Sequence, residues 1–316
     1  MGCPHLCVFC NQKNISGASH APSPEEVASY LDGSLSLGRP EAVVAFYGGT
    51  FTAIPLAEQG KYLAIAQRFM AEKRASGIRL STRPDEMDAQ TARFLKERGV
   101  RTVELGVQSL DDGVLKKSGR GHTAADAVRA ARTVKDAGLE LGIQLMAGLP
   151  GDSKGKFLKT VLGTVRLKPH FVRIYPALVV EGSELADTWR RGEYIPLTLD
   201  EAVELCAEAL EIFGTAGIKV IRLGLQPGEE LEKSLLAGPY HPSFGHLVKS
   251  NIALKKMLKA LEGFGGAAPQ FIVNSRELSI YKGIGGENIK KIKAATGRDA
   301  LISAGDAAPG TFKIVP

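Results

Sequence analysis

Residues 139–151, LELGIQLMAGLPG, join an apolar stretch to a turn made of glycine and proline. The apolar stretch has the length of a buried strand, and the preceding residue, Gly138, is a typical helix terminator. Other apolar stretches end in a similar way, on Gly48-Gly49-Thr50, Arg83-Pro84-Asp85 and Gln108-Ser109. Residues that follow the carboxyl ends of parallel strands meet at one rim of the sheet, where α/β barrels place their sites.

Predicted strands alternate with predicted helices over most of the chain. The strands are expected at 42–47, 78–82, 102–108, 139–147, 171–176 and 218–223. The helices are expected at 24–37, 55–75, 86–98, 124–137, 154–167 and 199–214. This alternation predicts a parallel sheet, and the shared rim favours a barrel over a doubly wound sheet. With about six strands, the fold class we expect is α/β, an incomplete (β/α)6-type barrel over residues 1–226.

The pattern changes after residue 226. Two helical stretches, 229–237 and 244–261, predict a helical extension over residues 227–265, and residues 263–269 have the glycine and alanine content of a linker. The order of elements then becomes strand (270–273), glycine loop, helix (287–296) and two strands (300–303 and 311–315). We therefore expect a small α+β domain over residues 269–316.

Charge is distributed unevenly along the 316 residues, whose net charge is +6. Residues 246–316 contain eleven Lys or Arg and five Asp or Glu, so this tail accounts for the whole excess. An anionic partner would explain the asymmetry, and so would a solvated basic face. No stretch has the length of a membrane span and no signal peptide is evident, so we expect a cytoplasmic protein without a membrane partner.

Three of the four cysteines lie close together, at Cys3, Cys7 and Cys10, within MGCPHLCVFCNQ. Crowded thiols outside a secreted disulfide framework indicate metal binding. Three thiolates would leave one iron of a four-iron cluster open for another ligand. Cys206 stands alone in a helical stretch, as a core cysteine does. A zinc site with His5 as fourth ligand is the alternative, although no second ligand pair follows downstream.

The chain's beginning bears on the barrel. A metal-binding loop at the rim should follow a first strand, yet only Met1 and Gly2 precede Cys3. Either the first strand is missing or the chain begins downstream of its natural start, and we favour the second interpretation.

The cysteine spacing, with Phe9 before the last cysteine, resembles the signature of the radical S-adenosylmethionine (SAM) superfamily. Several stretches resemble one branch, the catalytic subunit of Elongator and its shorter bacterial relatives. They are FYGGTFT (46–52), TRPDEM (82–87), VELGVQSLDDGVLKKSGRGHT (103–123), LMAGLPGD (145–152) and VRIYPALVVEGSELADTWRRGEY (172–194). Together they cover almost all of residues 1–226, which implies a radical SAM barrel.

The resemblance implies two cofactors and a site for each. Cys3, Cys7 and Cys10 would hold a [4Fe–4S] cluster, and an electron donor would reduce it so that SAM is split and a 5′-deoxyadenosyl radical abstracts hydrogen from a substrate. The SAM-binding residues would be Phe9, Gly48, Gly49, Thr50, Ser81, Gln108, Arg120 and Gln144. The Gly-Gly-Thr turn would bind the amino group of SAM, and Arg120 its carboxylate. Oxygen-independent coproporphyrinogen oxidase, a cousin, has Gln and Arg at the spacing of Gln108 and Arg120.

Two departures from these families weaken the expectation that this chain contacts the SAM ribose as they do. They also weaken the expectation that it shares the substrate of the oxidase. Ser81 stands where Elongator relatives commonly have an acid, and Gln144 where the oxidase has Asp. No catalytic residue is assigned. Tyr47, Arg173 and Tyr175 face the rim by strand position, where either contact with substrate or radical or ordinary packing would explain them.

The substrate follows less directly. About ninety residues come after Gln226, too few for the acetyltransferase domain of Elongator, so we expect the radical chemistry without that domain. RNA modification is the first interpretation. A radical SAM oxidase or synthase for a small molecule is the second, and a zinc-stabilised RNA-binding protein without activity is the third.

The segment KGIGGENIKKIKAATG (282–297) resembles the KH pattern, in which a Gly-x-x-Gly loop clamps the backbone of single-stranded nucleic acid. The resemblance implies an RNA-binding set for single-stranded or transfer RNA. Its members are Gly283, Ile284, Gly285, Gly286, Lys290, Lys291 and Lys293. Ile289 and Ile292 would face a core. A structural cap on the barrel is the alternative role for this segment.

Overall fold

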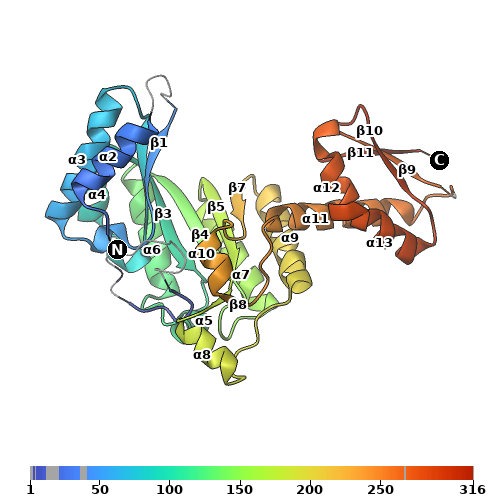
Figure 1. Ribbon diagram of the computed structural model, residues 1–316, viewed down its shortest axis with the longest axis horizontal. Helices are drawn as coiled ribbons and strands as arrows, with labels where there is room; N and C mark the ends of the chain where they lie inside the picture. The colour runs from blue at the N-terminus through green and yellow to red at the C-terminus, as the bar shows by residue number, and fades with distance from the viewer. Residues whose placement is uncertain (1–2, 4, 12–20, 36–40, 267, 316) are drawn as a thin grey trace. The chain divides into compact units, whose positions relative to one another are not determined.

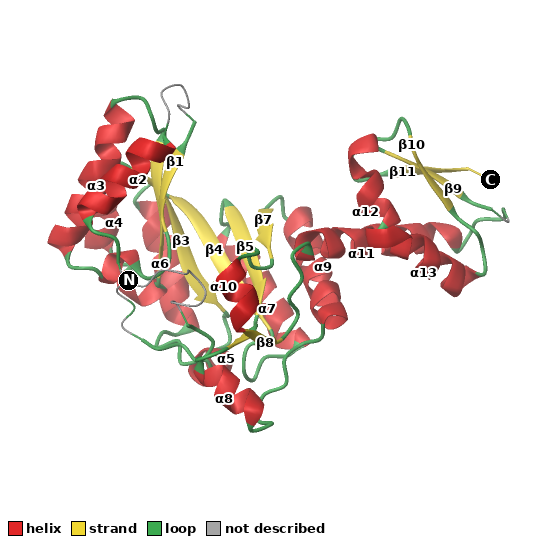
Figure 2. Cartoon of the chain, viewed as in Figure 1, coloured by secondary structure: helices red, strands yellow, loops and turns green. Residues whose placement is uncertain are grey.

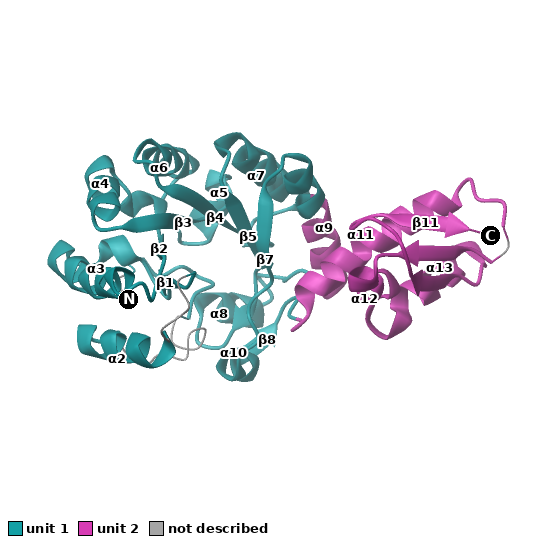
Figure 3. Ribbon diagram, turned by 90° about the horizontal axis from the view of Figure 1, so that it is seen from above, with its two compact units in different colours: residues 1–198, 209–240 teal, residues 199–208, 241–316 magenta. Residues whose placement is uncertain are grey.

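A computed structural model describes residues 3, 5–11, 21–35, 41–266 and 268–315. The chain divides into two compact units (Figure 3). The first unit comprises Met1–Thr198 and Ala209–Tyr240, and the second comprises Leu199–Glu208 and His241–Pro316. The predicted helical extension, 227–265, is divided between the two units. The expectation of a first strand before Cys3 concerns residues outside those described.

The first unit is built on a parallel sheet of six strands (Figure 2). In sheet order the strands are β1 (Val43–Phe46), β2 (Gly77–Thr82), β3 (Val100–Gln108), β4 (Glu140–Ala147), β5 (Phe171–Pro176) and β7 (Lys219–Leu223). Every neighbouring pair is parallel. Each of these strands coincides with a predicted one to within two residues, so the expected α/β half-barrel is confirmed.

One helix, α2 (Pro24–Ser34), precedes β1, and longer helices lie between successive strands of the sheet. These are α3 (Leu56–Ala71), α4 (Ala89–Glu97), α6 (Ala124–Asp136), α7 (Lys154–Leu167) and α9 (Leu199–Thr215). Figure 3 shows α3, α4, α6 and α7 along one side of the curved sheet. Ser23 and Thr123 begin α2 and α6 with capping boxes, in which Glu26 and Asp126 return the hydrogen bond.

The two faces of the sheet differ in chemistry because side chains alternate along a strand. On β3, Val103, Leu105 and Val107 are fully buried. The intervening residues Glu104, Gly106 and Gln108 line a cavity on the other face. The sheet therefore has an apolar face for the helices and a polar face for the site.

Several short elements of this unit were not predicted from sequence. They are η1 (Phe51–Ala53), η2 (Pro84–Glu86), α5 (Asp112–Lys117), α8 (Glu184–Arg190) and β6 (Val179–Val180). The predicted helix 229–237 is shorter than expected: α10 (Glu229–Ser234) ends early, because β8 (Leu235–Ala237) pairs with β6 in an antiparallel ribbon.

The second unit has a sheet of its own, in the order β10 (Leu301–Ala304), β9 (Gln270–Val273), β11 (Phe312–Val315). β10 is parallel to β9, and β11 is antiparallel to it. Its helical elements are α11 (Phe244–Leu261), η3 (Ser275–Glu277), α12 (Leu278–Lys282), η4 (Ile284–Gly286) and α13 (Glu287–Thr296). Figure 1 shows these elements in orange and red. Within the described part of the chain, no helix has the length and apolar character needed to cross a membrane.

Candidate active site

A cavity of about 370 Å³ lies at the rim of the six-stranded sheet, lined by residues of the cysteine loop and by residues from β1 to β5 or just beyond them. All the side chains predicted to bind cluster or SAM line it. They are Cys3, Cys7, Phe9, Cys10, Gly48, Gly49, Thr50, Ser81, Gln108, Arg120 and Gln144. The residues that were expected at the rim from sequence therefore lie around one cavity. The role of each residue stays a prediction.

The cysteine loop is fixed by its backbone and by one aromatic side chain. The amide of Val8 donates to the carbonyl of Ser118 (3.2 Å), and the carbonyl of Val8 accepts from the amide of Leu185 (2.7 Å). Phe9 packs against two apolar clusters, one of which includes Leu185 and the other Leu149. The loop is thereby attached to the ends of α5 and α8, two elements that the sequence did not reveal.

The three cysteines line the cavity. Cys3 Sγ lies 3.1 Å from Thr50 Oγ1, and the amide of Cys10 donates to the carbonyl of Cys7 (2.9 Å). Burial raises the pKa of the Cys10 thiol to about 11, and the nearby Cys7 and Cys3 act in the same direction. Bound iron would reverse this effect, because a coordinating thiol is deprotonated. Three thiols that line one cavity, with no fourth cysteine among the residues of its wall, supply the ligand chemistry of a cluster with one open iron.

His5, the fourth ligand in the zinc alternative, also lines the cavity. Its Nε2 atom lies 3.7 Å from Asp85 Oδ2. Among the described residues, no three Cys, His, Asp or Glu side chains are grouped in a way that could hold a metal ion.

Two arginines surround the sulfur of Cys7. Nη1 of Arg120 lies 3.2 Å from it and Nη1 of Arg83 lies 3.8 Å from it. Arg83 is fixed by a bidentate pair with Asp85, at 3.0 and 2.9 Å; its place at the rim was expected, but its contact with Cys7 was not predicted. Arg120 also donates to the carbonyl of Gly106. The buried Nε of Arg120 has no hydrogen-bond partner.

Gln108 has an unusual backbone for a residue with a side chain. Its φ is +67°, and the β3–β4 register shifts between Gly106 and Gln108. A bulge at the end of a strand re-aims the side chain, and strained residues cluster at functional sites. The buried Oε1 of Gln108 has no hydrogen-bond partner, so it is available to a ligand in the cavity.

A second polar group occupies the same cavity. Glu104, which is 2% exposed, accepts a 2.5 Å hydrogen bond from the Tyr47 hydroxyl and lies 2.7 Å from Nε of Arg173. Burial, and then the bond to Glu104, raises the pKa of Tyr47. Sequence analysis named Tyr47 and Arg173 but missed Glu104. An acid within the apolar run TVELGVQ, in phase with Gly106 and Gln108, was the available signal.

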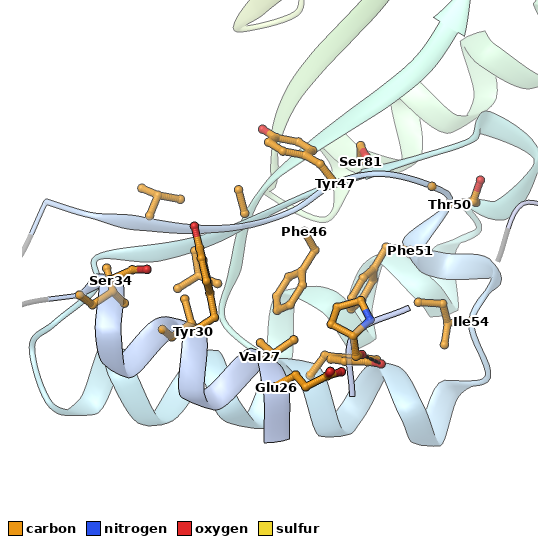
Figure 4. A pocket seen from close by; sticks show the side chains of 18 residues that line it. Glu26, Val27, Tyr30, Ser34, Phe46, Tyr47, Thr50, Phe51, Ile54 and Ser81 are labelled. Atoms are coloured by element: carbon orange, nitrogen blue, oxygen red, sulfur yellow. Dashed lines mark hydrogen bonds between the residues drawn. The ribbon is translucent and has the colours of Figure 1, made fainter. Parts of the chain in front are cut away.

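A larger and more apolar cavity of about 770 Å³ lies beside α2 and β1. Figure 4 shows Phe46 and Phe51 on the side of β1 that faces α2, and Tyr47 and Ser81 on the opposite side. None of its lining residues is a cysteine or an arginine. The chemistry therefore belongs to the smaller cavity, where the titratable groups gather.

The predicted RNA-binding residues lie in the second unit, on the loop between α12 and α13 and on α13 itself. Gly283, Gly285 and Gly286 all have positive φ, at 74°, 61° and 74°. Lys290 and Lys291 are exposed, whereas Lys293 is exposed but paired with Asp299 at 2.7 Å. Ile292 is buried and Ile289 packs against the same core, as predicted.

A parallel half-barrel whose rim gathers three thiols, two arginines and a glycine turn defines a class of enzymes that combine an iron–sulfur cluster with a bound cosubstrate. The Radical SAM superfamily profile matches residues 1–162, and the Radical_SAM C-terminal domain profile matches residues 169–253. The chain belongs to the radical SAM superfamily. It is an enzyme whose cofactors are a [4Fe–4S] cluster and SAM, so the alternative of a zinc-stabilised protein without activity is wrong.

Curated relatives support the Elongator-like resemblance. The chain is 38% identical to the tRNA uridine(34) acetyltransferase of Methanocaldococcus jannaschii over 145 aligned residues. The aligned residues cover 45% of this chain and 27% of that protein. It is 29% identical over 230 residues to the tRNA uridine(34) acetyltransferase of Dehalococcoides mccartyi, covering 61% and 50%. The chain thus spans half or less of these two relatives.

A solved structure agrees with the fold. The archaeal Methanocaldococcus infernus Elp3 with N-terminus deletion (1-46) matches with a TM-score of 0.63 and 26% identity, over 74% of this chain and 59% of that one.

Proposed function

We propose that this radical SAM enzyme modifies RNA, and that the segment 269–316 is a KH-like domain that binds the RNA strand. The observation that supports this most is the loop Gly283–Gly286, which joins α12 to α13 and leads into a helix that exposes Lys290 and Lys291. Glycine loops of this kind clamp a single-stranded backbone, and lysines neutralise its phosphates. The relatives named as tRNA uridine(34) acetyltransferases point to transfer RNA as the substrate.

At the half-barrel, we assign Cys3, Cys7 and Cys10 as the cluster ligands. The chemistry that the cluster supplies when bound is reductive cleavage of SAM, which yields a 5′-deoxyadenosyl radical able to take hydrogen from a substrate. Phe9 holds the cysteine loop in place. Around Cys7, Arg83 and Arg120 are only 3% and 6% exposed, so water has little access to this part of the site, which would protect a radical from side reactions.

The remaining residues of the set hold SAM. We place its amino group at the turn Gly48-Gly49-Thr50, where the absence of two Cβ atoms lets a ligand approach the backbone. Its carboxylate is assigned to Arg120, whose Nε is unpartnered. Gln108 supplies an amide oxygen, and Ser81 and Gln144 supply hydrogen bonds to the ribose.

The reaction also needs a partner that delivers electrons to the cluster. Thiols that must remain free for iron suit a reducing compartment, so we place the protein in the cytoplasm.

Deuterium transfer tests the proposed function. The reconstituted protein is reduced in the presence of SAM and of bulk transfer RNA deuterated on its bases and riboses, and 5′-deoxyadenosine is analysed by mass spectrometry. We expect deuterium in the product, because the radical takes its hydrogen from the RNA. If deuterium appears only with a deuterated extract of small metabolites, RNA is not the substrate and a small-molecule oxidase or synthase is the function.

A further inference from the structure

The cavity contains charged residues that the binding of cluster and SAM does not require. Glu104 and Arg173 line it together with Tyr47 and Tyr175. Glu104 Oε2 lies 2.7 Å from Arg173 Nε, and Glu104 Oε1 lies 3.4 Å from Nε of Arg79. One buried carboxylate thus faces two guanidinium groups, and the side chains of Arg79 and Arg173 are 26% and 21% exposed. The three groups together carry one more positive than negative charge, which an anionic ligand in the cavity would balance.

The group is held in place by the packing of its neighbours. The guanidinium of Arg79 stacks on Phe171, at 4.8 Å from the ring centroid. Gly142 makes room for this arrangement: a Cβ there would come within 2.4 Å of the Phe171 ring and 2.9 Å of Glu104 Cγ. Arg173 in turn stacks over Tyr47 at 5.5 Å. Such pre-organisation is typical of a binding site rather than of a mobile surface ion pair.

Arg173 retains donors for a ligand. Its Nη atoms lie 3.4 Å from the Tyr175 hydroxyl, 3.3 Å from the Tyr47 hydroxyl and 3.4 Å from Glu104 Oε1. These contacts are longer than ordinary hydrogen bonds of this type. Arg83, in the same cavity, contrasts with it because both of its bonds to Asp85 are 3.0 Å or shorter. An oxyanion could therefore take closer bonds from Arg173 than its present neighbours do.

The group lies level with the two residues assigned to the ribose of SAM. Glu104 pairs in register with Ser81 on β2, and Arg173 pairs in register with Gln144 on β4. The position is therefore beside the ribose, whose 5′ carbon would carry the radical that meets the substrate.

We propose that Arg173 binds an oxyanion of the substrate, a phosphate or a carboxylate, and that Glu104 positions Arg173 for this contact. The proposal rests on the proposed function only in that hydrogen abstraction takes place in this cavity. A nucleotide would supply the phosphate, and a small-molecule substrate would supply the carboxylate.

Two matched pairs of probes test the charge preference of the cluster-loaded, SAM-bound enzyme by calorimetry. One pair is uridine 5′-monophosphate against uridine, and the other is orotate against uracil. We expect the charged member of at least one pair to bind roughly tenfold more tightly or better, the usual effect of a charge-assisted hydrogen bond. Arg173→Gln should abolish the preference, and Arg173→Lys, which keeps the charge without the planar fork, should retain part of it.

Arg101→Gln is the matched control. Arg101 lies on β3, the strand of Glu104, but its side chain is 66% exposed and pairs with Glu140, so the preference should be unchanged. Glu104→Gln should weaken the preference while Arg173 is still present, because the guanidinium loses its anchor.

Three results would overturn the proposal. The wild-type enzyme could show no preference for the charged member of either pair, or both Arg173 variants could keep the full preference. Arg173→Gln could also lower SAM affinity by the same factor, which would make Arg173 a SAM residue. A preference for uridine 5′-monophosphate assigns the anion to a nucleotide, and a preference for orotate assigns it to a small carboxylate. Because the deuterium experiment reports on RNA alone, either idea can fail while the other stands.

Discussion

The backbone of Gln108 is in a conformation that lowers stability, while its side chain is placed to bind SAM. Its φ of +67° is a conformation that glycine adopts at little cost and other residues adopt at a cost of about 1 kcal/mol or more. We predict that Gln108→Gly is about 1 kcal/mol more stable than Gln108→Ala, while both variants bind SAM less tightly than the wild type. Denaturant unfolding of the apoprotein measures the stability difference, and calorimetry with the cluster-loaded protein measures the affinity.

Gln144 is the control for this prediction, because it lines the same cavity on the neighbouring strand and is not among the described residues of positive φ. There the order should be reversed, with Gln144→Ala more stable than Gln144→Gly. Equal stability of the two Gln108 variants would mean that the backbone of Gln108 is not strained.

The four cysteines should differ sharply as cluster ligands. Cys3, Cys7 and Cys10 line the cavity, whereas Cys206 is fully buried in α9 and burial raises its pKa to about 12. We predict that Cys3→Ala, Cys7→Ala and Cys10→Ala each lose the cluster and that Cys206→Ala keeps it. Iron and sulfide analysis after anaerobic reconstitution measures this. Loss of iron from Cys206→Ala would rule out a cluster with an open iron.

At the scale of elements, Asn288 fastens α13 to its neighbours. It is 4% exposed and donates to the carbonyls of Ser250 on α11 (3.0 Å) and Tyr281 on α12 (2.9 Å). We predict that Asn288→Ala lowers the free energy of unfolding by about 2–3 kcal/mol, because buried carbonyls lose their donor. Lys290→Ala, an exposed position on the same helix, should change it by less than about 0.5 kcal/mol. Denaturant unfolding followed by circular dichroism compares the two, and similar effects would contradict the role of Asn288.

Long helices and the strands of both sheets were predictable from sequence, and short helices were not. The six strands of the half-barrel and helices such as α11 and α13 have enough periodic residues to reveal themselves. α5, α8 and α12 have five to seven residues each, too few for a periodic pattern. β8 was predicted as the end of a helix because only its pairing with β6 makes it a strand.

The same reasoning explains the site. The glycine turn and Gln108 lie at strand ends, so their convergence could be predicted from the topology, whereas Arg120 follows α5 and was expected at the site only from the family resemblance. The position of Glu104 in an apolar run marked it as unusual, but the partners of Glu104 and Arg83 could not be predicted, because Tyr47 lies 57 residues from Glu104 and Cys7 lies 76 residues from Arg83. Contacts over such distances are set by the folded sheet and leave no local pattern.

At the scale of the whole molecule, the charge distribution separates two tasks. Residues 246–316 account for the entire net charge of +6, while the chemistry belongs to the half-barrel of the first unit. Binding of single-stranded RNA by the intact chain should therefore weaken as salt is raised, with a slope of about −0.7 in log K per phosphate contact. A salt-independent affinity would contradict phosphate binding by the lysines.

The glycine loop allows a closely matched test of RNA binding in the full-length protein. Gly285 and Gly297 both have positive φ, at 61° and 71°, and a Cβ at either would meet nothing within 4 Å. Asp is among the residues that tolerate this conformation, so Gly285→Asp and Gly297→Asp add the same charge at opposite ends of α13 with a similar backbone cost.

We predict that Gly285→Asp weakens RNA binding at least tenfold, because its carboxylate repels a phosphate clamped at the loop, and that Gly297→Asp weakens it far less. Fluorescence anisotropy with a labelled single-stranded RNA at low salt measures both, and SAM cleavage without substrate should be the same in the two variants. Equal affinities would mean that the loop does not hold RNA, and the segment would then be a structural cap.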